Sequence, residues 1–197
     1  MKKHKPLKKI KSGNKSVWIT QPKEIGNILK RRETALNIAR GKLNHTGKIE
    51  TAMQTAEAFG RGLFEELLRK EIQPDWTMKE WITPIAENIF NPLGTGATFT
   101  EIKEDQARSL IFRYINNKDE LDEPYISTLF NYGFLRGILL SAFPQGELIL
   151  KNSMAEGAAM DEFTFKTNAA ENDRIERERI KKIVLENSKM KIKHAYR

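Results

Sequence analysis

The stretch Pro124–Phe165, PYISTLFNYGFLRGILLSAFPQGELILKNSMAEGAAMDEFTF, decides the fold of this chain. Its first half is apolar almost throughout and contains Gly133 and Gly137, which predicts a buried helix with small residues at packing positions. A Pro-Gln-Gly tripeptide ends this helix. Two strands are then predicted, at Glu147–Asn152 and Asp161–Lys166, with Phe163 and Phe165 on one face.

Helices precede this stretch and one follows it. Apolar residues recur at helical spacing over Gln21–Leu43 and Ile49–Ile72, and Thr77 with Glu80 forms a capping box for a helix that continues to about Phe90, with a kink or restart at Pro84. After a Gly-rich turn the period changes to two, which predicts a β-hairpin with its loop at Lys103–Ala107. We therefore expect an α+β fold: a single domain with an antiparallel sheet packed against helices.

The ends of the chain differ from its middle in charge. Residues 1–45 hold 13 Lys/Arg and 2 acids, residues 46–180 hold 15 and 23, and residues 181–197 hold 6 and 1. The first 19 residues lack regular periodicity, which predicts a disordered tail. The predicted divisions are a basic flexible tail (1–20), a basic amphipathic helix (21–45), an α+β domain (46–168) and a charged C-terminal helix (169–197).

Basic ends on an acidic body can bind phosphates or an acidic protein surface. They can also serve solubility alone or fold back onto the acidic body. In the helix at Gln21–Leu43, Ile25, Ile28, Leu29, Leu36, Ala39 and Leu43 share the apolar face, and the cations occupy other faces. The candidate nucleic-acid-binding residues are Lys8, Lys9, Lys11, Lys15, Arg31, Arg32, Lys189, Lys191 and Lys193.

Several classes of chemistry are excluded. The chain has no cysteine, and its three histidines, His4, His45 and His194, lie in or beside the basic ends. Thiol catalysis and zinc sites of the usual kind are therefore absent, and no Walker-type phosphate loop occurs. The carboxylate pairs, such as Asp161 with Glu162, are expected to be solvated. Only a lysine or a carboxylate could serve catalysis, so an enzyme on an apolar substrate, with a carboxylate or Arg136 buried in a cleft, stays open as a third hypothesis. We expect no metal and no cofactor.

Arg136 lies within the central apolar helix and allows two interpretations. Its stem can cover apolar surface while its head stays in water. Alternatively, it anchors a carboxylate or phosphate at the mouth of an apolar pocket.

The order of motifs resembles the 4-vinyl reductase domain family over about residues 49–167. The segments that carry the resemblance are AEAFGRGLFEEL, GTGATFTEI, SLIFRYIN, FNYGFLRGILLSAF and SMAEGAAMDEFTF, with Gly60 and Gly157 among the matched glycines. The resemblance implies a compact α+β domain with an apolar cavity between helices and sheet, and the family extends more distantly to TRAPP vesicle-tethering subunits. Metal-binding members carry cysteines where this chain has Ser153 and Asp161, so the resemblance does not bring the metal site.

These observations predict a non-enzymatic binding module. A cavity lined by Phe59, Leu63, Phe112, Phe130, Phe134 and Ile138, with Arg136 near it, would hold a small apolar ligand or be filled by its own side chains. The chain would then serve as a regulatory or scaffold subunit, with its basic ends docked to an acidic partner. The alternative is an RNA-, ribosome- or DNA-associated assembly factor with a purely structural core.

The composition also bears on the cellular compartment and on the oligomeric state. The lack of cysteine and of a long apolar run predicts a cytoplasmic protein without a membrane span. Small residues on the central helix would permit a homodimer, which the sequence leaves open.

Overall fold

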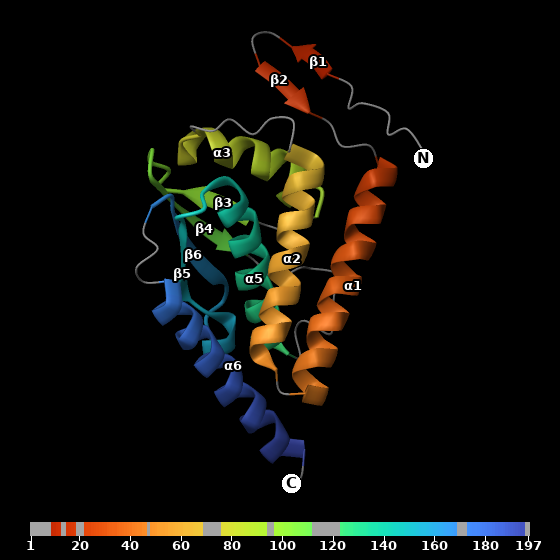
Figure 1. The fold of residues 1–197 in the computed structure, drawn as a ribbon, viewed down its shortest axis with the longest axis vertical. Helices are drawn as coiled ribbons and strands as arrows, with labels where there is room; N and C mark the ends of the chain where they lie inside the picture. The colour runs from red at the N-terminus through yellow and green to blue at the C-terminus, as the bar shows by residue number, and fades with distance from the viewer. Residues whose placement is uncertain are drawn as a thin grey trace.

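Helix α5, Pro124–Ala142, forms the centre of the molecule (Figure 1). Pro124 occupies the first turn, where its missing N–H costs no hydrogen bond, and every residue from Tyr125 to Leu139 is buried. A helix that is apolar on all sides needs cover on all sides, and this one has helices on one side and a sheet on the other. The computed structural model describes residues 9–12, 15–18, 22–46, 48–68, 76–93, 97–111, 123–168 and 173–195.

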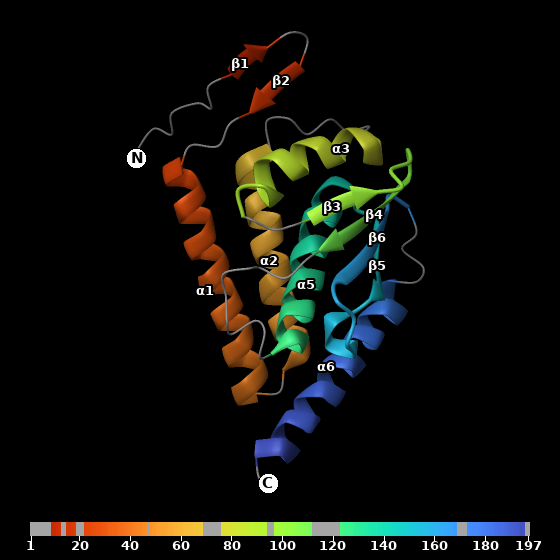
Figure 2. The same cartoon turned by 180° about the vertical axis from the view of Figure 1, so that it is seen from behind.

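Two long helices cover α5 in succession. Helix α2 (Ile49–Leu68) packs directly on α5, and helix α1 (Pro22–Thr46) lies along the outer side of α2 (Figures 1 and 2). The α2–α5 contact is close because glycines form it. A Cβ atom at Gly60 would lie 2.2 Å from the carbonyl oxygen of Phe134, and one at Gly137 would lie 2.2 Å from that of Glu57. The predicted packing role of the central glycines is confirmed.

Helix α3 (Met78–Ile85) begins with the predicted capping box, in which Thr77 and Glu80 exchange hydrogen bonds. The α-helix passes Pro84, ends at Ile85 and continues directly as a π-helical turn, η1 (Ala86–Phe90). Asn88 donates a hydrogen bond of 2.9 Å to the carbonyl oxygen of Pro84 within this turn. The expected interruption at the proline therefore takes the form of a wider helix.

The sheet has four antiparallel strands in the order β3-β4-β6-β5. They are β3 (Ala97–Thr100), β4 (Gln106–Ile111), β5 (Glu147–Asn152) and β6 (Asp161–Lys166). The last two match the predicted bounds, whereas β4 begins inside the predicted loop. The predicted continuation of this strand beyond Ile111, including Phe112, lies outside the described residues. The α+β architecture with an antiparallel sheet against helices is confirmed.

The two faces of the sheet differ in chemistry. Leu148, Leu150, Phe163 and Phe165 are fully buried toward the helices. The other face carries cross-strand ion pairs, in which Arg108 Nε lies 2.7 Å from Glu162 and Lys166 Nζ lies 3.2 Å from Glu147. Such alternation is what a sheet covered on one face requires.

Residues 9–18 differ from the predicted disordered tail. Lys9–Ser12 (β1) and Lys15–Trp18 (β2) pair as an antiparallel hairpin, with Ser12 opposite Lys15. The Gly-Asn dipeptide between the two strands is a sequence that favours two-residue hairpin connections. Backbone pairing does not require apolar alternation, so a search for periodicity misses this hairpin.

Helix α6 (Asp173–Ala195) confirms the predicted C-terminal helix, and its first half packs against α5 and β5. Leu29, which the sequence places on the apolar face of α1, is 42% exposed, and Ile175 on α6 is 68% exposed. Ile180, Ile183 and Val184 carry the buried face of α6. None of the described helices combines the length and the apolar character that a membrane span needs.

Candidate functional site

The predicted cavity lining forms one aromatic cluster between α2 and α5. Leu63, Phe130, Phe134 and Ile138 are buried, and Phe59 is half-buried at the edge of the cluster. The Phe59 and Phe134 ring centroids are 5.5 Å apart with the ring planes inclined by 29°, and the Phe59 and Phe130 centroids are 6.1 Å apart. The rings thus pack against one another in the space that an apolar ligand would need.

The cluster continues toward the sheet through further rings. The ring centroid of Phe90, at the end of η1, lies 6.3 Å from that of Phe134 and 5.5 Å from that of Phe99. The centroids of Phe99 and Phe165 are 5.9 Å apart. Ring separations of this size are typical of stacked and tilted aromatic pairs in protein cores. A ligand in this region would have to displace at least one ring.

Arg136 meets a carboxylate of its own chain. The residue is only 7% exposed, and its Nη1 atom lies 2.5 Å from Oε2 of Glu57 on α2. Glu57 also binds Arg61, one turn further along α2, at 2.8 Å. The expectation that the Arg136 head stays in water is therefore wrong, because the glycine-mediated approach of α2 brings a partner within reach.

The candidate nucleic-acid-binding residues do not form one surface among the described side chains. Arg31 is ion-paired with Glu66 at 2.5 Å. Arg32 is 7% exposed, and its guanidinium lies over the Phe130 ring, 5.6 Å from the centroid. The assignment of Arg32 to a basic outer face is wrong, because it shares a face with buried Ile28, Leu36 and Leu43.

The remaining basic candidates are placed by their backbone alone. Lys9, Lys11 and Lys15 lie on the β1–β2 hairpin, and the last three on α6. Their side chains, and Lys8 altogether, lie outside the described part of the chain. The six candidates placed in this way are Lys9, Lys11, Lys15, Lys189, Lys191 and Lys193.

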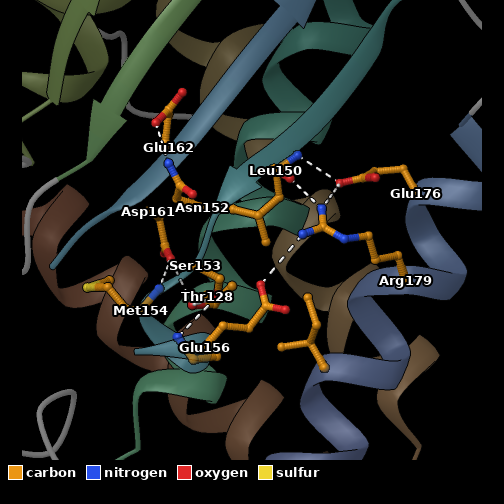
Figure 3. Close-up of polar contacts among 12 residues, drawn as sticks. Thr128, Leu150, Asn152, Ser153, Met154, Glu156, Asp161, Glu162, Glu176 and Arg179 are labelled. Carbon is orange, nitrogen blue, oxygen red and sulfur yellow. Dashed lines mark hydrogen bonds and ion pairs between the residues drawn. The ribbon is translucent and has the colours of Figure 1, made fainter. Parts of the chain in front are cut away.

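Asp161 is the centre of a polar cluster that the sequence did not predict (Figure 3). Its carboxylate is fully buried and accepts hydrogen bonds from the Thr128 hydroxyl and the Met154 N–H, each 2.9 Å, and from the Asn131 amide at 3.3 Å. Ser153 lies beside it, with its hydroxyl 3.3 Å from that of Thr128. The two positions at which metal-binding members of the resembled family carry cysteines are thus neighbours in space.

The expectation that Asp161 is solvated is wrong. Asp161, Phe163 and Phe165 alternate along β6 and therefore point to the same side of the sheet, toward α5. This alternation in the sequence is a signal that predicts a buried Asp161 carboxylate. Three donors suit an ionised carboxylate, and they tie α5, the Ser153–Gly157 turn and β6 together.

Glu162 was also expected to be solvated, and it is largely buried on the opposite face of β6. A hydrogen bond from Arg108 lowers the pKa of Glu162; burial opposes this shift, and Asn152 adds to it. Among the described residues, no three His, Asp or Glu side chains gather closely enough to hold a metal ion.

A second polar cluster joins α6 to the edge of the sheet (Figure 3). The Leu150 N–H donates a 2.8 Å hydrogen bond to Glu176, and the Leu150 carbonyl oxygen accepts one from Arg179. Nearby, Glu50 on α2 binds Arg177 and Lys181, and these residues with Arg174 and Glu178 line a polar pocket of about 280 Å³. Charged groups thus hold the first half of α6 at two places.

Comparisons with known proteins bear on the fold. No family model matches this chain, and no curated protein matches it. A crystal structure of trafficking protein particle complex subunit 3 from Naegleria fowleri, covalently bound to palmitic acid, is similar to it with a TM-score of 0.50. The identity is 16%, and the match covers 73% of this chain and 96% of that one. The α+β fold of this chain is therefore shared with a subunit of a trafficking complex.

Proposed function

We propose that this chain is a non-enzymatic scaffold subunit that binds protein partners. The observation that carries the proposal is the internal pairing of its buried charges. Asp161 accepts three hydrogen bonds from its own chain, and Arg136 is paired with Glu57. A catalytic or ligand-binding charge usually faces a cleft, where it can meet a substrate. These charges instead connect structural elements.

The likeness to a trafficking-complex subunit supports a role in a protein assembly, as does the excess of cations at both ends of the chain. In this proposal the basic ends dock to an acidic surface of a partner. A cytoplasmic setting is part of the proposal, since the chain has no cysteine. We also propose kinship with the 4-vinyl reductase domain family, because the helices and strands follow one another in the order that the resemblance implies.

A small apolar ligand is the second candidate, and one observation favours it. Phe59 is only half-buried, and its ring covers both Phe130 and Phe134. Movement of this single side chain would open the aromatic cluster to solvent. With no cysteine, the chain offers no thiol to bind a fatty acid as a thioester, so such a ligand would be held without a covalent bond to sulfur.

Co-isolation of the full chain from the cells that express it tests the proposal. The matched variant replaces Lys8, Lys9, Lys11 and Lys15 by Gln, which removes charge from the N-terminal end and leaves the body unchanged. We expect a protein partner at constant stoichiometry that resists nuclease, and weaker capture of it by the variant.

The other outcomes decide between the alternatives. Capture that nuclease abolishes would support the assembly factor that binds RNA or DNA and would refute the scaffold. Native mass spectrometry that finds an apolar molecule of constant mass, with no protein partner, would support the ligand-binding module instead.

A further inference from the structure

Strand β5 is an edge of the sheet, and α6 covers it in place of a further strand. Both backbone groups of Leu150 point away from β6 toward α6. The N–H meets the Glu176 carboxylate, and the carbonyl oxygen meets the Arg179 guanidinium (Figure 3). In an antiparallel pair, a residue of the neighbouring strand engages both groups of one residue in the same way. Two side chains of a helix thus take the hydrogen-bonding place of a strand.

The hold of α6 on the body is partly ionic. Arg179 also lies 3.2 Å from Glu176 and 3.5 Å from Glu156, and a second contact joins Lys181 to Glu50 at 2.7 Å. Among the described side chains of α6, three are both apolar and buried: Ile180, Ile183 and Val184. The rest of the helix extends past the body (Figures 1 and 2). Charge–charge contacts of this kind weaken in salt, which leaves Ile180, Ile183 and Val184 to hold the helix on the core.

The strand under the helix is prone to pairing. Its centre is Leu148-Ile149-Leu150, three uncharged residues with apolar side chains. An uncovered edge strand of this composition offers its free N–H and C=O groups to another strand. If β5 paired with β5 of a second molecule about a twofold axis, each contact would occur twice, which favours a closed dimer.

We infer that α6 is a strap that masks a strand-pairing edge, and that β5 of a second copy of this chain occupies the edge when the strap lifts. The inference rests on the contacts of Leu150 and not on the proposed scaffold role. It assigns to α6 a function that its charged sequence alone does not indicate. The strap keeps the protein from joining edge to edge until a change in conditions or a competitor for α6 releases it.

The test compares two variants of the full chain, each of which replaces one acidic and one basic residue by methionine. The strap variant carries Glu176→Met and Arg179→Met. The control carries Lys182→Met and Glu186→Met on the same helix, where the two side chains are exposed and 4.0 Å apart. Hydrogen exchange of the Leu150 amide and sedimentation over a range of concentrations are measured for both.

The strap variant should exchange the Leu150 amide about tenfold or more faster than the control, and it should form dimers at concentrations where the control does not. Adding Ile149→Lys to the strap variant should restore the sedimentation of the control, because a lysine on an edge strand opposes pairing. Should the variant fail to fold, salt replaces mutation: about 1 M NaCl should speed exchange at Leu150 of the unchanged chain more than at Phe163.

Three results would overturn the inference. Equal exchange at Leu150 in the strap and control variants, or in low and high salt, would show that α6 does not protect the edge. Faster exchange without dimers would remove the second copy as the occupant. Dimers that persist with Ile149→Lys would place the contact away from β5.

Discussion

Replacement of Gly60 by alanine tests the closest contact in the molecule. The added Cβ would lie 2.2 Å from the carbonyl oxygen of Phe134, where ordinary contact begins at 3.4 Å, so α2 and α5 must separate by about 1 Å. Overpacking of this kind costs about 3 kcal/mol at the upper end of its usual range. Alanine gains about 1 kcal/mol over glycine in a helix. The net expectation is a loss of about 2 kcal/mol in the free energy of unfolding.

The matched control lies two residues along the same helix. A Cβ at Gly62 meets no atom within 4 Å, so Gly62→Ala should gain about 1 kcal/mol from helix propensity alone. Urea unfolding of both variants gives the comparison, and thermal unfolding should place Gly60→Ala about 4–8 °C below the parent. If Gly60→Ala proved as stable as Gly62→Ala, the close approach of the two helices would be refuted.

Three further substitutions test carboxylates that pair with other groups of the chain. Asp161→Asn should lower the free energy of unfolding by about 2 kcal/mol, because the amide turns an N–H₂ group toward donors. The control Asp105→Asn, in the exposed loop, should change it by less than about 0.5 kcal/mol. Urea unfolding that ranks the two variants equally would contradict the polar cluster. Glu57→Gln should cost about 3 kcal/mol, since the buried Arg136 loses its carboxylate, against less than about 1 kcal/mol for Glu66→Gln at the exposed Arg31 pair. Burial raises the pKa of Glu50, but the hydrogen bond from Lys181 and the charge of Arg177 outweigh it, so the pKa falls below 4.5. The contribution of Glu50 to stability is therefore complete above pH 4.5 and is lost as the pH falls through the pKa of Glu50 in the folded state. The difference in urea midpoint between the parent and Glu50→Gln should shrink at acid pH. A difference that stays constant with pH would contradict the pairing.

Local patterns in the sequence predict most of the elements because burial and backbone geometry agree there. Strands β5 and β6 have the predicted bounds, since Gly146 and the turn at Ser153–Gly157 separate them from their surroundings. Helix α5 was predicted from its apolar composition and from the prolines at its two ends. Its close contact with α2 follows from glycines whose role is steric and therefore visible in the sequence.

The polar contacts were harder to predict because they depend on residues far apart in the chain. Arg136 and Glu57 are 79 positions apart, and Asp161 and Thr128 are 33 apart. As one of the paired acids of an acidic body, Asp161 is expected to be solvated, although its alternation with Phe163 indicates the buried face. The charge of Arg32 likewise predicts an outer face, although the residue shares the helical face of Ile28 and Leu36.

The π-helical turn at Ala86–Phe90 has a consequence for the length of the chain. A π turn holds one residue more than an α-helical turn would over the same path. Deletion of that residue would restore α geometry and leave the residues after it in place, whereas a deletion within the regular turns of α3 would rotate η1 by about 100° around the helix axis. Phe90 would then leave the place between Phe99 and Phe134 that it now occupies. Relatives of this protein should therefore vary in length in the exposed loop Glu101–Asp105 and lose at most the extra residue of η1, but they should keep a constant length in α3 (Met78–Ile85), which sets the orientation of the Phe90 ring.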